Sequence, residues 1–257
     1  MRYLLASAAA LGLATAAMGD WGHPIKWDQL SPGFDTFGAF STIDNDSPAF
    51  GLTADDFMCM ESGFITDIHF AGFSQFGDGF IEGFRITFWT DIPATPDDES
   101  QPGNLLYDYT VGAVDPADPL GIGWQALGDD TYRINLPQDE WFQQEEGNIY
   151  WIGIQGVMVD DGFGDSFYWN FVDRDLPTWG DDAAFESETF GFAPWANWGW
   201  QDDGAGGLEP NLYEGAFPGD PFVKSADMAF ALSGIIPAPG ALALLGIAGL
   251  MGGRRRR

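Results

Sequence analysis

Short stretches of alternating apolar and polar residues recur along the chain, and each predicts a β-strand, because successive side chains of a strand point to opposite faces. In the stretch 64–70 the polar face holds Asp67 and His69, so we expect His69 at the surface. The apolar face of that stretch consists of Phe64, Ile68 and Phe70. The other predicted strands are 84–89, 105–111, 131–136, 149–159, 166–172 and 225–232, of which 149–159 is apolar enough to be buried on both faces.

Turns rich in glycine, proline and aspartate separate these strands, for example at 94–99 and 160–165. No stretch shows the longer apolar stripe of a helix, and we find neither an internal repeat nor a break in composition. Short strands punctuated in this way are typical of β-sandwiches. The sequence therefore predicts an all-β fold, with a single jelly-roll-like β-sandwich over residues 20–234.

The first 19 residues predict a secretory signal peptide. A positive start at Arg2 precedes the apolar run 4–16, and the small residues Ala17-Met18-Gly19 fit a cleavage site, with Ala14-Thr15-Ala16 as an alternative. The run is too short to span a membrane permanently. We expect signal peptidase to remove it during export.

The last residues predict a short transmembrane helix that stops in the membrane. The uncharged run 241–251 follows Pro237-Ala238-Pro239-Gly240, and the chain closes with Arg254, Arg255, Arg256 and Arg257. An arginine at the centre of a bilayer costs roughly 2.5–3.5 kcal/mol on insertion scales, so we expect this cluster to stay cytoplasmic and the domain to lie outside. The apolar stretch of about 19 residues is marginal for a stable span.

This tail resembles the PEP-CTERM sorting signal of Gram-negative exported proteins: a proline motif, a short apolar segment and a basic cluster, here over residues 235–257. Ala238 stands where that family most often has glutamate. The resemblance implies that an exosortase-like membrane transpeptidase cleaves near Pro237–Pro239. It also implies an inner-membrane intermediate, followed by release to the cell surface or the extracellular matrix. An ordinary tail anchor is the alternative.

The charge of the chain is concentrated in its middle. Of 39 acidic residues all lie between Asp20 and Asp227, and only five basic residues lie among them, which gives that region a formal charge of −34. Such a field repels nucleic acid and anionic lipid and attracts cations. We therefore expect no nucleic-acid partner.

Candidate catalytic residues form no recognisable pattern. Cys59 is the only cysteine, so no intramolecular disulfide can form, and we expect a buried, inert thiol, with an intermolecular bridge as the alternative. Neither His23 nor His69 belongs to a recognisable triad. Adjacent carboxylates such as Asp55/Asp56 are frequent in so acidic a chain, and a glycosidase needs two of them across a cleft. We expect no enzyme; an extracellular glycan hydrolase is an alternative.

Two further groups of residues could bind a ligand, one a calcium ion and the other a polysaccharide. Carboxylates on glycine-containing loops suit Ca²⁺, although no loop follows the EF-hand pattern and solvated turns are the simpler interpretation. The candidate ligands are Asp44, Asp46, Asp160, Asp161 and Asp165. The segment 194–203 carries Trp195, Trp198 and Trp200 among polar residues, in what reads as a loop. These indoles could form a platform for extracellular polysaccharide, while packing within the domain is the expected role.

The order of motifs from Ala54-Asp55-Asp56-Phe57 to Pro102-Gly103-Asn104 resembles an uncharacterised sandwich domain of planctomycete-type surface proteins. That resemblance implies the fold and no activity. The sequence thus predicts a non-enzymatic exported protein with a structural or interaction role, and a carbohydrate-binding module as the first alternative.

Overall fold

The computed structural model describes residues 23–30, 33–44, 50–96, 98–118, 121–159, 164–173, 175, 180, 182–202, 208–213 and 224–236. Within them lie seventeen β-strands and two short 3-10 turns, η1 (Asp78–Phe80) and η2 (Gln138–Glu140). The strands are β1 (Ile25–Asp28), β2 (Phe34–Phe40), β3 (Thr42–Asp44), β4 (Phe50–Met58), β5 (Gly63–Ser74), β6 (Ile81–Ile92), β7 (Gln101–Gly112), β8 (Gly123–Gly128), β9 (Thr131–Asn135), β10 (Phe142–Gln144), β11 (Ile149–Met158), β12 (Phe167–Val172), β13 (Ala184–Ser187), β14 (Phe192–Asp202), β15 (Leu208–Tyr213), β16 (Lys224–Ser225) and β17 (Phe230–Ile235).

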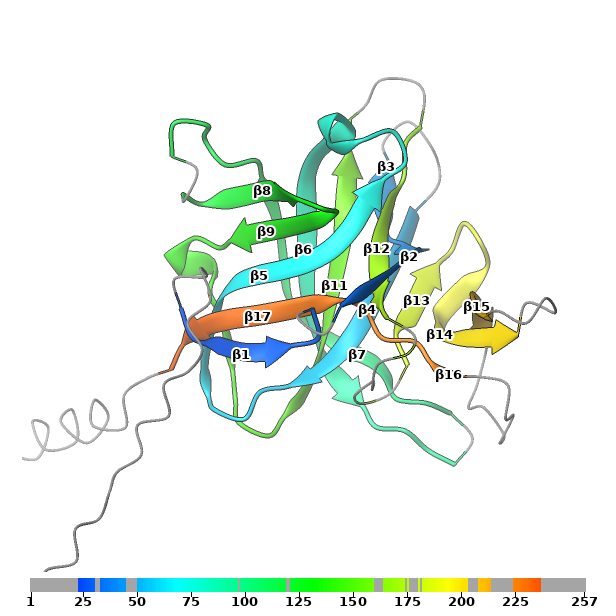
Figure 1. Ribbon diagram of the computed structural model, residues 1–257. Helices are drawn as coiled ribbons and strands as arrows, with labels where there is room; N and C mark the ends of the chain where they lie inside the picture. Colours follow the sequence, from blue (N-terminus) through cyan, green and yellow to red (C-terminus); the bar gives the residue numbers. More distant parts are fainter. Residues whose placement is uncertain are drawn as a thin grey trace, which may run out of the picture.

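The strands form two sheets that pack face to face as a sandwich (Figure 1), which confirms the all-β prediction. The first sheet has the order β1-β17-β5-β12-β2, with β10 and β9 also paired to β5 and β8 paired to β9. The second has the order β15-β14-β13-β4-β3-β11-β6-β7, with β16 on β14 and a direct pairing of β4 with β11. Nearly all pairings are antiparallel; that of β3 with β11 is parallel.

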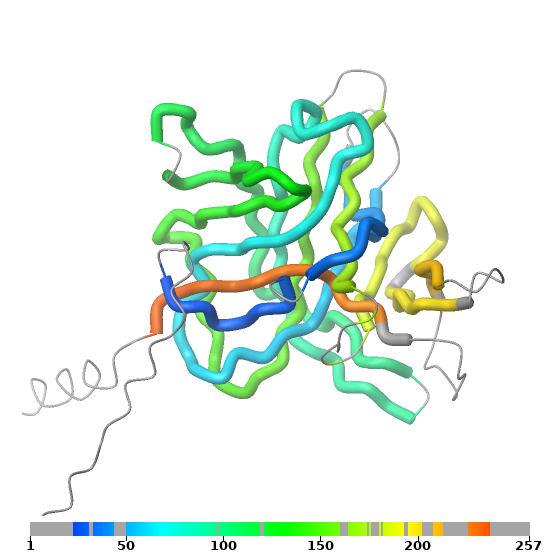
Figure 2. Tube along the Cα trace, viewed as in Figure 1, coloured from blue at the N-terminus to red at the C-terminus, as the bar shows by residue number. Residues whose placement is uncertain are grey.

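The chain passes between the sheets repeatedly, and the passages at Ser41 and at residues 226–229 lie against the core. At Ser41 it leaves β2 and enters β3, and the Thr42 hydroxyl donates to the carbonyl of Phe167 at 2.9 Å. Gly156 allows β11 to approach β12 there, since a Cβ would come within 2.4 Å of the Cβ of Phe167. At residues 226–229 the chain crosses back from β16 to β17 (Figure 2).

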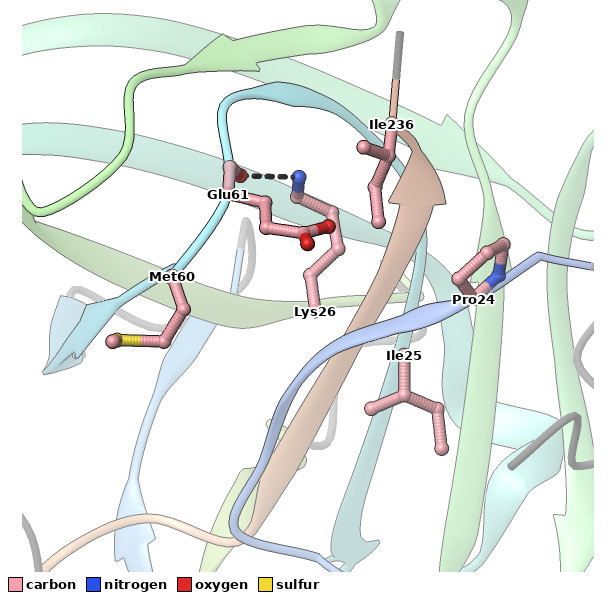
Figure 3. Close-up of a pocket in the computed structure, with 6 residues that line it drawn as sticks. All are labelled: Pro24, Ile25, Lys26, Met60, Glu61 and Ile236. Carbon is pink, nitrogen blue, oxygen red and sulfur yellow. Dashed lines mark hydrogen bonds between the residues drawn. The ribbon is translucent and has the colours of Figure 1, made fainter. Parts of the chain in front are cut away.

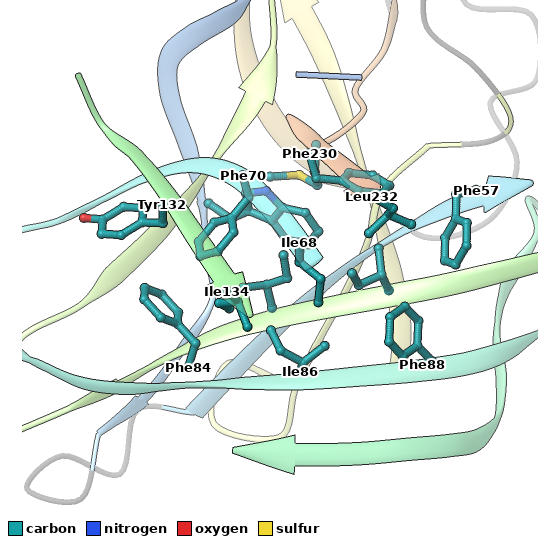
Figure 4. Packing of buried hydrophobic residues seen from close by; sticks show 14 of the residues in the cluster. Phe57, Ile68, Phe70, Phe84, Ile86, Phe88, Tyr132, Ile134, Phe230 and Leu232 are labelled. Carbon is teal, nitrogen blue, oxygen red and sulfur yellow. The ribbon is translucent and has the colours of Figure 1, made fainter. Parts of the chain in front are cut away.

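Phenylalanine and tryptophan rings fill the space between the sheets (Figure 4). Phe84 lies at the centre: its ring centroid is 5.0 Å from that of Phe70, 5.1 Å from Phe167 and 5.3 Å from Trp124. Most of these contacts are edge-to-face, the arrangement that aromatic rings prefer. The alternation predicted for 84–89 and 131–136 places Phe84, Ile86, Phe88, Tyr132, Ile134 and Leu136 in this core, as expected.

Two local predictions for β5 are wrong. In β5 the register against β17 slips at Thr66, and this bulge brings Ile65 rather than Phe64 onto the core face with Ile68 and Phe70. His69 is buried, because β5 lies in the middle of its sheet and Arg133 of β9 is paired beside it. Burial first, and then the nearby Arg133 charge, lower the pKa of His69 to about 4, so the ring is neutral at neutral pH.

The segment of three indoles is a strand, β14, rather than a loop. Long pairings with β13 and β15 hold it in the sheet, so its side chains alternate between the two faces. By contrast, the strand expected at 149–159 is found as β11, and it is buried along nearly its whole length.

The first and last described strands are neighbours. In β1, Ile25 is paired with Ser233 of β17, and the Gly234 N–H donates to the carbonyl of Pro24 at 3.0 Å. The two ends of the sandwich therefore lie side by side at one edge of the first sheet (Figure 2).

The predicted signal peptide and the tail from Pro237 lie outside the described residues. Within those residues the structure has no helix with the length and apolar character needed to cross a membrane.

We predict that Phe84→Ala lowers the free energy of unfolding by about 3–5 kcal/mol, because it leaves a cavity among rings that cannot collapse into it. Leu106→Ala is the control, since Leu106 is exposed and should change stability by no more than about 0.5 kcal/mol. Urea unfolding followed by tryptophan fluorescence measures both. Equal effects of the two substitutions would contradict the placement of Phe84 at the centre of the core.

Candidate functional site

A row of small residues crosses the outer face of the second sheet. Gly153 of β11 is paired with Ala54 of β4, which is paired with Ala184 of β13. Thr87 of β6 and Asn197 of β14 extend the row at its two ends. Paired residues project to the same face, so these five side chains lie in one row across the sheet. The three at its centre are glycine and alanine, so they project only a short distance from the backbone. We call this row the floor.

Three indoles cover the floor. Trp151 is fully buried against Ala54 and Ala184, and the half-buried Trp89 and Trp195 pack on the same cluster. The ring centroids of Trp89 and Trp195 are 5.9 Å apart in an edge-to-face contact. Four strand spacings, about 19 Å on a flat sheet, separate their strands. The sheet must therefore curl, and its outer face is concave over the floor.

Some polar groups of this face have hydrogen-bond partners within the protein, and others have none among the described residues. Arg85 donates to both carboxylate oxygens of Asp108, at 2.8 and 2.7 Å, and to the Gln155 side-chain oxygen at 2.9 Å. The hydrogen bonds from Arg85 hold the pKa of the Asp108 carboxyl below its usual range. The indole N–H of Trp151 donates to Asp91 at 2.9 Å. These groups form a structural network.

Asn197 differs from them. Its side chain is 0% exposed, and neither its amide nitrogen nor its amide oxygen has a hydrogen-bond partner within the described part of the chain. The indole nitrogen of Trp89 is likewise buried and lacks a partner there. Buried amides in native proteins nearly always have partners, from protein, ordered water or ligand. The floor is thus one of the described places where buried polar groups have no partner within the protein, and at Asn197 both ends of one amide lack a partner.

The structure separates the three indoles of the predicted glycan platform. Trp195 lies over the floor, whereas Trp198 and Trp200 point to the opposite face and pack against the core. Trp200 is only 1% exposed, with its ring 5.3 Å from that of Phe171. The three indoles therefore do not form one platform. Trp89 and Trp151, which the sequence did not single out, take the places beside Trp195.

The adjacent carboxylates Asp55 and Asp56 project to opposite faces of β4, as consecutive strand residues must. Asp55 is buried towards the core, and its carboxyl accepts the N–H of Met228 at 2.8 Å, in the segment that crosses between the sheets. Burial raises the pKa of Asp55 well above its usual range, and the nearby carboxyl groups of Asp227 and then Asp56 raise it further. Asp55 is therefore a structural acceptor whose protonated form is favoured by its burial.

Cys59 is buried in the core, which confirms the expected inert thiol. Burial raises the pKa of the Cys59 thiol to about 12, so the nucleophilic thiolate is scarce at neutral pH.

The candidate calcium ligands lie in part outside the described residues, which include neither Asp46, Asp160 nor Asp161, and Asp44 only by its backbone. Asp44 is paired in parallel with Met158, so β3 and β11 end at the same edge of the sheet. Asp165 is buried and accepts a hydrogen bond from the Ser74 hydroxyl at 2.6 Å. Within the described ranges no group of three or more acidic, histidine or cysteine side chains could hold a metal ion.

Two hollows adjoin these features. One, of about 260 Å³, is lined by Lys26, Glu61 and Ile236 where the two ends of the sandwich meet (Figure 3). The Lys26 ammonium donates to the Glu61 carbonyl at 2.8 Å, and burial lowers the pKa of Lys26. The other, of about 560 Å³, is open and lies at the ends of β6 and β11, where Asp91 and Ile149 line it.

We predict that stability falls as the pH rises above about 4, in part through Asp55. Between its unfolded pKa of 3.8 and its raised folded pKa, the folded protein keeps a proton that the unfolded chain has lost. Asp55→Asn cannot titrate, so its urea midpoint should fall less between about pH 5 and about pH 8 than that of the wild type. Asp98→Asn, at an exposed carboxylate, controls for the loss of one charge. Equal pH dependence in wild type and Asp55→Asn would contradict the prediction.

For the candidate calcium ligands, solvated turns remain the expected role; calcium bound by these carboxylates is the alternative, and it predicts a melting temperature raised by about 5 °C when calcium is far above its Kd. Asp161→Ala should remove that increase, and Mg²⁺ should not reproduce it, because Mg²⁺ demands a tighter octahedral site. Scanning calorimetry with calcium and with chelator measures the shift. An unchanged melting temperature would rule calcium out.

Comparison with known protein families matches residues 25–233 to DUF7901, a domain of unknown function. No curated protein and no solved structure matches the chain. The matched segment begins at the first residue of β1 and ends within β17, so it spans the whole sandwich. The chain therefore belongs to the DUF7901 family of domains of unknown function.

Proposed function

We propose that this protein is an exported, non-enzymatic component of the cell surface or extracellular matrix of a Gram-negative-type bacterium, with a structural or interaction role. Signal peptidase removes residues 1–19. An exosortase-like transpeptidase then recognises the tail 235–257 in the inner membrane and cleaves it near Pro237–Pro239, which releases the acidic domain.

The pairing of β1 with β17 is the observation that carries this proposal. Those strands begin at Ile25 and end at Ile235, so both proposed cleavage sites fall outside the sandwich. Their side-by-side positions attach the leader and the tail to the same edge of one sheet. Removal of either segment therefore takes away no core residue and no strand among those that the structure describes. A domain that must survive two cleavages needs this arrangement.

The charge distribution supports the same route. The acidic middle region, at −34, avoids anionic lipid and stays soluble outside the membrane, while Arg254–Arg257 favour the cytoplasmic side. The frequent passage of the chain between two sheets also fits the finer assignment of a jelly-roll-like sandwich. That architecture is common in domains with binding or structural roles, and fold alone implies no chemistry.

We predict that the exported protein lacks both end segments. Intact-mass analysis of the mature wild type, produced in an exosortase-containing host, should show a chain that begins near Asp20 and ends near Pro237–Pro239. Deletion of Arg254–Arg257 should leave the tail uncleaved, because the basic stop that holds the segment in the membrane is gone. Replacement of the four arginines by lysines is the matched control and should restore cleavage. A mature wild-type protein that retains its full tail would contradict the proposed processing.

A further inference from the structure

We propose that the concave outer face of the second sheet binds a neutral sugar residue of a glycan, with Asn197 and the Trp89 indole nitrogen as its hydrogen-bonding groups and Trp89 and Trp195 as its apolar walls. This site goes beyond the proposed export and processing.

The first step of the argument is the unmet hydrogen-bonding capacity of Asn197. Its amide offers two donors and an acceptor, none of them satisfied within the described residues. Because Asn197 is paired with Ala184, its side chain projects onto the floor that Trp89, Trp151 and Trp195 cover. A buried, unsatisfied amide facing small residues leaves a need for a partner that carries both donors and acceptors.

The second step is the chemistry of that partner. Hydroxyl groups donate and accept at once, so a pair of sugar hydroxyls can satisfy the Asn197 amide, and one more can accept the indole N–H of Trp89. The C–H faces of a sugar ring are apolar and pack against indole faces. Trp89 and Trp195 are each only partly buried, and a single edge-to-face contact joins their rings, so a sugar ring reaches Asn197 when these two indoles move apart.

The third step excludes other ligand classes. An acidic sugar or a phosphate would meet the field of a region that carries −34 charges, and Arg85 is already held by Asp108 and Gln155. An extended peptide needs a free strand edge for pairing, whereas the floor lies on β6, β11, β4, β13 and β14, each paired on both sides in the sheet. A neutral glycan meets neither obstacle.

The open hollow of about 560 Å³ gives a longer glycan somewhere to continue. Asp91, which accepts the Trp151 indole N–H, also lines that hollow, so hollow and indole cluster are contiguous. The hollow presents the exposed apolar side chains of Leu106 and Ile149 beside the amide of Asn148. Alternating apolar and polar groups of this kind suit further sugar units along one chain.

Affinity electrophoresis of the mature protein tests the site. Each gel contains one polysaccharide: a neutral β-glucan, a galactomannan, a xylan, or alginate. Alginate is the acidic polysaccharide against which the three neutral ones are compared. We expect at least one neutral polysaccharide to retard the wild type. Asn197→Ala should weaken that binding about tenfold or more, and Trp89→Phe, which removes the indole N–H and keeps an aromatic ring, about threefold or more. Asn211→Ala is the matched control, because Asn211 is exposed on the neighbouring strand β15; its binding should stay within about twofold of wild type.

Near-UV circular dichroism of each variant separates lost binding from lost folding; if Asn197→Ala does not fold, Trp89→Phe decides. Retardation by no neutral polysaccharide, retardation by alginate alone, or equal retardation of wild type and folded variants would overturn the proposal. None of these outcomes depends on the termini of the mature protein. The gels therefore test the glycan site alone, and the intact-mass analysis tests the proposed export and processing alone.

Discussion

Burial of aromatic rings between the two sheets is the interaction on which the rest of the structure depends. The region between leader and tail carries a charge of −34, and repulsion among its acids opposes the compact state. Ion pairs do little against it: the described residues contain two, Arg85–Asp108 and Arg133–Asp67. The core around Phe70, Phe84 and Phe167 must offset both that repulsion and the cost of burying carboxyl groups such as Asp55.

Much of this architecture could be predicted, because alternation reports directly on strands with one buried face. The stretch 131–136 follows that rule residue by residue, and 84–89 follows it except at Thr87, which is buried on the floor. Alternation fails where both faces are covered or where one residue is inserted. His69 is polar and yet buried in a central strand, and the bulge at Thr66 moves Ile65 onto the core face in place of Phe64. Neither effect is visible until the strands are paired.

The candidate site was much less predictable, since it is created by register between strands that are distant in the sequence. Trp195 was recognised for its aromatic neighbours, but its actual companions, Trp89 and Trp151, come from β6 and β11. Nothing local marks Asn197 as buried. The one signal available was β-strand alternation in 192–202, which would have placed Trp195 and Asn197 on one face and Trp198 and Trp200 on the other.

The sandwich is complete without its end segments because β1 and β17 close one edge of the first sheet together. Thermal unfolding of a chain comprising residues 20–236 tests this most directly, beside a chain of residues 20–257 in detergent. The melting temperatures should agree within about 2 °C, since every described core residue is kept. A chain that ends at Ala229 lacks β17 and should not fold. A melting temperature of the 20–236 chain lower by more than about 5 °C would contradict a domain that is complete between its two processed ends.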